Sequence, residues 1–200
     1  MRLHRHVPVV FGILLCAPSV AHAHLVNSGM GPFYDGAIHF FLSPEDWLGL
    51  LVAACLAGLC GAQAGRWTLA ALPVGWLFGA IFGLVIVDVP EMGGLSILSF
   101  MALGLLVALD VKLPAWIIAT LGGLLGLLHG LLNGSSLQEA DGGLLNVLGI
   151  VTTVFVLLLL GSALVVSLRP AWARVAVRVA GSWAVAVGVL MIGWLFRGAV

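Results

Sequence analysis

Long apolar runs separated by short polar breaks fill the chain from residue 45 onward. A membrane-spanning helix needs about 20 mainly apolar residues, because each residue adds about 1.5 Å of rise. The runs therefore predict an all-α, polytopic membrane protein with six transmembrane helices and short connecting loops. The helices are expected near residues 45–62, 67–87, 94–109, 114–134, 143–167 and 175–195.

A different pattern precedes these runs, and it predicts a signal peptide over residues 1–23. Arg2 and Arg5 come first, then a short apolar stretch over 7–15, then "AHA" at 21–23. The alternative is an uncleaved first span, but the stretch is shorter than a spanning helix requires. Cleavage would leave residues 24–44 as a periplasmic segment with a short interfacial helix, and 45–200 as the six-helix transmembrane domain.

The composition is typical of a membrane protein, and it helps to exclude some classes of function. Hydrophobic residues make up 62% of the 200 positions, charged residues 8%, and the mean hydropathy is +1.21. No predicted loop is long enough for a nucleotide-binding fold, and we expect neither an enzyme nor a nucleic-acid partner. Cys55 and Cys60 are five residues apart in one apolar helix, so they predict packing and not a disulfide framework.

The charged residues predict how the chain crosses a bacterial inner membrane. With a periplasmic mature N-terminus, only Arg197 among the basic residues after the leader lies outside, as the positive-inside rule requires. The cytoplasmic loops then hold Arg66, Lys112, Arg169, Arg174 and Arg178. The outer side holds Asp35, Glu45, Asp46, Asp88, Glu91, Glu139 and Asp141, with only Asp110 inside. This outer surface either attracts cations or simply collects charges that had to lie in loops.

Two glycine series predict close helix packing around a polar pair. Glycine recurs at every fourth residue over 75–83 and over 122–134, which lets helix backbones approach each other. His129 adjoins Gly130, so we expect its imidazole to face the bundle interior. His129 and Asn133 are i and i+4 on one helical face and are candidate metal ligands, although a structural interhelical hydrogen bond is the alternative.

The segment before the first span supplies more candidate ligands. Pro32 can begin a short helix that places Asp35 and His39 at i and i+4, a spacing that suits two ligands of one divalent ion or an ordinary ion pair. The "SPED" stretch predicts a helix start capped by Ser43, with Asp46 at the capping-box position. Helix capping is a sufficient reason for an acid at position 46, with no metal involved. The prediction that Asp46 binds metal therefore depends only on its expected location at the outer end of the helical bundle.

His24 is a candidate metal ligand for a different reason. As the first mature residue it would offer both an α-amine and an imidazole nitrogen, a chelating pair suited to copper or nickel. The alternative is that a histidine beside the cleavage site is incidental.

These motifs together resemble the HupE/UreJ family of membrane proteins. The family's first-helix motif has a histidine, a proline-bearing turn and then Asp-His; "HFFLSPEDW" matches it with His39 and Asp46, but Trp47 replaces the second histidine. Its later His-Gly-x-x-His-Gly motif is matched by "HGLLNG", with His129 kept and Asn133 in place of a histidine. The resemblance covers the mature chain and implies a secondary metal permease associated with nickel supply to hydrogenase and urease.

The leading hypothesis is accordingly a permease for a divalent transition metal, nickel first, working with metalloenzyme maturation proteins. The alternative is a membrane accessory protein that binds copper or nickel without transporting it. The metal is then substrate or bound ligand, and its expected ligands are His24, Asp35, His39, Asp46, His129 and Asn133. A bis-histidine haem carrier is disfavoured because no c-type attachment motif is present. A serine hydrolase is disfavoured because Ser162 should lie far from His129.

Overall fold

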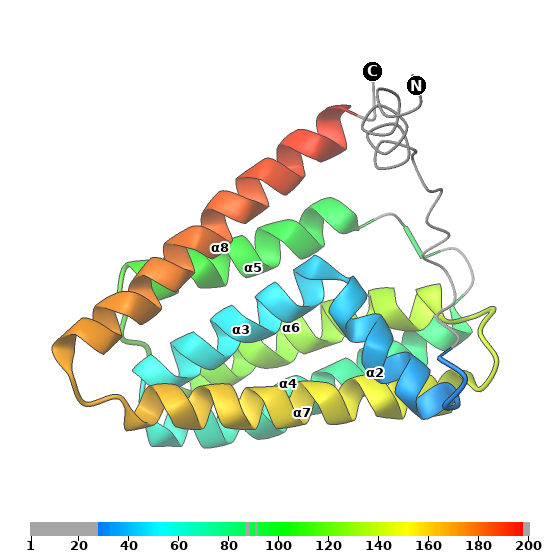
Figure 1. Ribbon diagram of the computed structural model, residues 1–200, viewed down its shortest axis with the longest axis horizontal. Helices are drawn as coiled ribbons and strands as arrows, with labels where there is room; N and C mark the ends of the chain where they lie inside the picture. Colours follow the sequence, from blue (N-terminus) through cyan, green and yellow to red (C-terminus); the bar gives the residue numbers. More distant parts are fainter. Residues whose placement is uncertain (1–27, 87–88, 91, 198–200) are drawn as a thin grey trace, which may run out of the picture.

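Seven helices make up the part of the chain that the computed structural model describes, residues 28–86, 89–90 and 92–197 (Figure 1). No strand occurs within these ranges, so the predicted all-α class is confirmed. The predicted signal peptide and His24 lie outside the described residues. The helices are α2 (Pro32–Leu42), α3 (Pro44–Leu59), α4 (Ala62–Val85), α5 (Gly93–Ala108), α6 (Ala115–Ser136), α7 (Gly143–Ser167) and α8 (Ala171–Arg197).

Each predicted span coincides with a helix, but the helices differ in length. Four of them, α4, α6, α7 and α8, are long and apolar enough to cross a membrane. The pair α2 and α3 adds a fifth candidate if it is counted as one span bent by 80°. Helix α5 is apolar but has only 16 residues. The described chain therefore contains four to five candidate spans.

Helices α4 and α6 are parallel and touch backbone to backbone. A Cβ added at Gly130 would meet the Trp76 carbonyl, and one added at Gly79 would meet the carbonyl of Leu127. Gly126 and Gly134 meet the neighbouring turns of α4 in the same way. The predicted use of the glycine series is confirmed, since any larger side chain on this seam would separate the two helices.

Helix α2 is the short helix that Pro32 predicted, and it folds back over the bundle. Its Gly36 lies against the backbone of Asn146 on α7, while Gly149 of α7 lies against the backbone of Phe33. The chain then turns sharply at Ser43 into α3. This turn brings the start of α3 beside the end of α2 and against the last turns of α6, where Asp46 meets Asn133 (Figure 1).

Helices α5 and α8 form a pair on one side of the other helices (Figure 1). Helix α5 packs mainly against α8 and α3, and much less against α6. Gly104 and Gly181 provide the close contact between α5 and α8. The α5–α8 pair is therefore a layer distinct from the α4–α6 seam.

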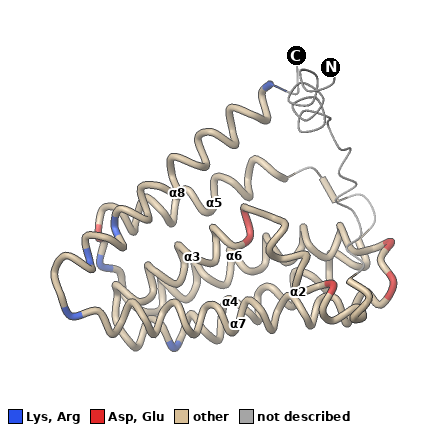
Figure 2. Tube along the Cα trace, in the orientation of Figure 1, with Lys and Arg blue, Asp and Glu red and all other residues tan. Residues whose placement is uncertain are grey.

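Most basic residues lie toward one end of the helices and the acidic loop between α6 and α7 lies at the other, while the start of α3 carries acidic residues between the two ends (Figure 2). At the basic end Lys112 donates to the Leu59 carbonyl at 3.1 Å and pairs with Asp110 at 2.6 Å. Arg174 lies 3.6 Å from the same carboxylate. The Lys112 hydrogen bond, together with the nearby positive charges, holds the pKa of Asp110 below its usual value. The described residues therefore show the predicted separation of charge in part, since Asp46 lies in the interior and Asp88 and Glu91 lie outside the described residues.

Candidate metal site

A buried hydrogen-bonded cluster links the start of α3 to the last turns of α6. Oδ1 of Asp46 lies 2.7 Å from Nδ1 of His129, and Asn133 donates from Nδ2 to Oδ2 of Asp46 at 2.8 Å. The three residues are 2%, 0% and 4% exposed, in the order Asp46, His129, Asn133. A buried carboxylate needs partners to offset its desolvation, and here each of its oxygens has one.

Asp46 therefore does not cap the helix, which is the structural role that the "SPED" pattern predicts. Ser43 does lie at the N-cap of α3, but it makes no side-chain capping hydrogen bond. The Asp46 carboxylate is directed instead toward α6. The capping-box interpretation is wrong because a buried imidazole and a buried amide compete for the carboxylate, and both lack water as an alternative partner.

The other ring nitrogen of His129 faces α5. Ser99 Oγ lies 3.0 Å from His129 Nε2 and 2.6 Å from the backbone oxygen of Ser96. A carbonyl oxygen only accepts, so the Ser99 hydroxyl donates to it and leaves its oxygen lone pairs toward Nε2. Because the hydroxyl hydrogen points away from the imidazole, this arrangement differs from the activated serine of a hydrolase triad.

Helices α3 and α4 complete the walls around the imidazole. The ring centroids of Trp76 and His129 are 5.5 Å apart, and a Cβ added at Gly49 would lie 3.4 Å from His129 Cε1. Two buried polar atoms beside the ring have no hydrogen-bond partner among the described residues, Asn133 Oδ1 and Trp76 Nε1. The cluster is thus closely packed but retains unused hydrogen-bonding capacity.

The remaining predicted ligands lie farther toward the acidic end. His39 is on α2, with Nε2 3.3 Å from the Ser136 hydroxyl, which donates to the Asn133 carbonyl. Asp35 accepts from the backbone N–H of Ser28 at 2.7 Å, and it does not pair with His39 in the described structure. The predicted i, i+4 ion pair on α2 is therefore absent, although both residues lie on that helix.

Polar groups nevertheless form a continuous line from α2 to α5. It runs through His39, Ser136, Asn133, Asp46, His129 and Ser99. In the described residues, no group of three or more His, Cys, Asp or Glu side chains is placed to hold a metal ion. An ion at this line would accordingly use imidazole nitrogen together with amide, hydroxyl or carbonyl oxygen.

The orientation of His129 indicates which atom would bind. Metal-binding histidines usually donate one ring N–H to a carboxylate, which fixes the ring and makes the other nitrogen the ligand. Asp46 occupies Nδ1 in this way, so an ion would bind Nε2 and replace its hydrogen bond to Ser99. Asp46 is then a positioning residue for His129.

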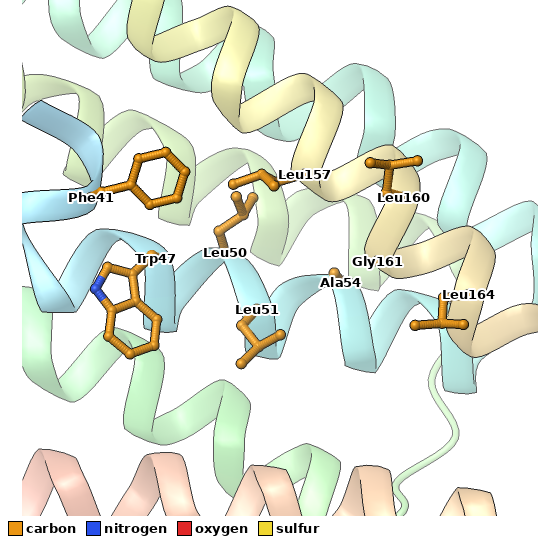
Figure 3. Close-up of a pocket in the computed structure, with 9 residues that line it drawn as sticks. All are labelled: Phe41, Trp47, Leu50, Leu51, Ala54, Leu157, Leu160, Gly161 and Leu164. Atoms are coloured by element: carbon orange, nitrogen blue, oxygen red, sulfur yellow. The ribbon is translucent and has the colours of Figure 1, made fainter. Parts of the chain in front are cut away.

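A pocket between α3 and α7 has a different chemistry from this cluster. It measures about 640 Å³, with Phe41, Trp47, Leu51 and Leu164 among its lining residues (Figure 3). Its nine lining residues are all apolar or glycine, and the Trp47 indole nitrogen is the one polar side-chain atom among them. Such a lining suits hydrocarbon and offers no ligand to a cation.

Comparison with known proteins identifies the family. The family model described as HupE / UreJ protein matches residues 12–191. The chain belongs to the HupE/UreJ family. The protein HupE of Rhizobium leguminosarum bv. viciae is 30% identical over 185 residues, which cover 90% of this chain and 94% of that protein. No solved structure matches significantly. HupE/UreJ proteins are membrane accessory proteins and are not known catalysts.

Sequence reasoning missed Ser99 and undervalued Asp46. "SILS" places two hydroxyls at i and i+3 in an otherwise apolar helix, and polar groups within spans are a recognised indication of a site. For Asp46, an acid at a helix start has two explanations, and only the position of α6 distinguishes them. Ser162, the serine considered as a partner of His129, bonds to the Leu159 carbonyl of its own helix.

Proposed function

We propose that this HupE/UreJ protein is a secondary permease for a divalent transition metal ion, with nickel as the first candidate. The observation that carries the proposal is the buried His129 imidazole, held at Nδ1 by Asp46 and directed at Nε2 toward α5. Ionisable residues inside membrane spans are rare, and they commonly mark the path or binding site of an ion. Membership of the HupE/UreJ family supports the choice of metal, because the family is generally linked to nickel and cobalt uptake for hydrogenase and urease.

The ion would enter from the acidic end of the bundle, which we place at the periplasmic face of a bacterial inner membrane. Carboxylates there raise the local cation concentration. His24, Asp35 and His39 would capture the ion, and His39 would pass it along the polar line toward His129. Mixed nitrogen and oxygen ligands bind an ion tightly enough for entry and weakly enough for release.

The proposed arrangement in the bilayer follows the positive-inside rule. A cleaved leader over residues 1–23 and six crossings would place Lys112 and Arg174 in the cytoplasm, with the mature N-terminus outside. The ion released there would be available to metalloenzyme maturation proteins.

Nickel accumulation in cells that express the chain tests the transport proposal. His129→Ala should abolish accumulation above background, since it removes the central nitrogen ligand. Thr120→Ala is the matched control, because Thr120 is exposed on the same helix and bonds only to the Trp116 carbonyl. Equal accumulation by His129→Ala and parent protein, at equal amounts in the membrane, would reject transport through this site.

The second candidate function is a metal-binding accessory protein without flux. Complete burial of His129 favours it, because a closed site can also retain an ion. N-terminal sequencing and metal analysis of purified protein, with and without His24→Ala, would show whether the terminus binds copper or nickel. Stoichiometric metal without flux into proteoliposomes would favour this function over transport.

A further inference from the structure

Ser99 connects the two layers of the fold at the proposed site. It lies on α5, which packs mainly with α8 and α3, while His129 lies on α6 at the α4–α6 seam. Their hydrogen bond is 3.0 Å long between Oγ and Nε2, the ring nitrogen that Asp46 does not contact. An ion that binds Nε2 must therefore meet Ser99.

The 3.0 Å separation is that of an ordinary hydrogen bond, and it also matches the spacing of two adjacent ligands in an octahedral or square-planar complex. Ligand atoms about 2.1 Å from an ion and at right angles to each other lie about 3.0 Å apart. At a tetrahedral angle the same bonds would place them about 3.4 Å apart. An ion held by both atoms would replace this hydrogen bond, and ligands at right angles would require the least movement of the two side chains.

The chemistry of Ser99 also suits a ligand. Its hydroxyl donates to the Ser96 carbonyl at 2.6 Å, so that the oxygen lone pairs remain toward His129. A second hydroxyl, Ser96 Oγ, is buried beside it and has no partner among the described residues. By contrast, both carboxylate oxygens of Asp46 already accept hydrogen bonds.

We propose that Ser99 Oγ and His129 Nε2 are adjacent ligands of the ion, which makes Ser99 a residue that determines metal specificity. The proposal rests on the proposed function, since it assumes that a transition metal reaches His129. It places the ion between α5 and α6, on the side of the imidazole away from Asp46. It also makes the position of α5 a condition for binding.

Cobalt binding to the purified full-length protein in detergent tests the inference. In Ser99→Cys a thiolate replaces the hydroxyl, and a thiolate-to-cobalt charge-transfer band should appear in the near-ultraviolet spectrum. The parent, which contains Cys55 and Cys60, should show no such band. Ser182→Cys is the matched control, because Ser182 makes the same hydrogen bond to the carbonyl three residues earlier but lies exposed on α8.

Affinity gives a second readout with nickel as the probe. Ser99→Ala should weaken binding about tenfold, while Ser99→Thr, which keeps the hydroxyl, should bind within about twofold of the parent. Ser182→Ala should bind as the parent does. Thermal unfolding of each variant separates a lost ligand from a damaged fold.

The two proposals fail in different ways. If the parent binds nickel, His129→Ala does not, and the Ser99 variants show neither the band nor the affinity loss, the inference is wrong and the proposed function stands. A Ser99→Thr protein that binds as weakly as Ser99→Ala would also overturn the inference. If the parent binds neither cobalt nor nickel, both proposals are wrong.

Discussion

Asp46 and His129 are 83 positions apart in the sequence, and their side chains meet at 2.7 Å inside the helical bundle. The contact joins the first turn of α3 to α6, and Asn133 extends it to the second carboxylate oxygen. Asp46 thereby sets the orientation of the imidazole and determines which nitrogen faces α5. The properties of the proposed site depend on this pair.

Replacing Asp46 should weaken metal binding without removing it. Asp46→Asn keeps the size of the side chain but loses the charge that fixes His129 Nδ1, so nickel affinity should fall about tenfold to a hundredfold. Titration of purified protein with nickel measures the change. Glu45→Gln is the control, because Glu45 is the neighbouring acid and lies outside the cluster. Equal losses from both variants would mean that general charge, and not orientation of His129, is responsible.

Asn133→His should strengthen metal binding. The His-Gly-x-x-His-Gly motif that "HGLLNG" resembles has a histidine at this position, and the substitution supplies its imidazole. Imidazole is a stronger ligand than an amide for nickel and copper. Nickel affinity should rise about tenfold in the same titration. Asn146→His places the same change on α7, where Asn146 bonds to the Asp141 carbonyl, and should have no such effect. An Asn133→His protein that binds like the parent would argue against a ligand position here.

Gly130→Ala should destabilise the bundle. The added methyl group would meet the Trp76 carbonyl, and separating α4 from α6 should cost about 1–3 kcal/mol, as overpacking does in other proteins. Gly123→Ala is the control on the same helix, because its Cβ would find only ordinary contacts, the nearest at 3.6 Å. Thermal unfolding in detergent should show a lower midpoint for the first variant alone. An unchanged midpoint for Gly130→Ala would contradict the backbone contact.

Asp110→Asn should reveal a pH-dependent contribution at the basic end. The folded-state pKa of Asp110 lies below its usual value, so its ion pairs with Lys112 and Arg174 stabilise the fold above about pH 4 and are lost as pH falls through the folded-state pKa. The contribution should be about 1 kcal/mol or less, because the pairs are largely exposed. Unfolding midpoints of parent and variant should differ at pH 7, and the difference should shrink steadily as the pH falls below about 4. A difference that stays constant over that range would assign it to another cause. Asp141→Asn is the control, since its carboxylate makes no ion pair in the described part of the chain.

The helices and their packing seam could be predicted from sequence because both depend on local composition. Apolar runs long enough to cross a membrane must form helices there, since unpaired backbone groups are too costly in lipid. Glycine at every fourth residue predicts a backbone contact, and Gly79 and Gly130 make such contacts. The family could also be predicted from the motif resemblance around His39, Asp46 and His129, and the match of the family model over residues 12–191 confirms it.

Tertiary structure decided what those residues do. An acid in the first turn of a helix is explained equally well by the helix dipole and by a distant partner, and the choice for Asp46 depends on where α6 packs. The "SILS" pattern marks Ser99 as a polar residue within a span, but only the packed structure identifies its partner, which lies 30 residues away across a helical interface. The sequence alone determined that this is a membrane protein with a buried histidine, while the packing of α3 and α5 around α6 determined which atoms that histidine meets.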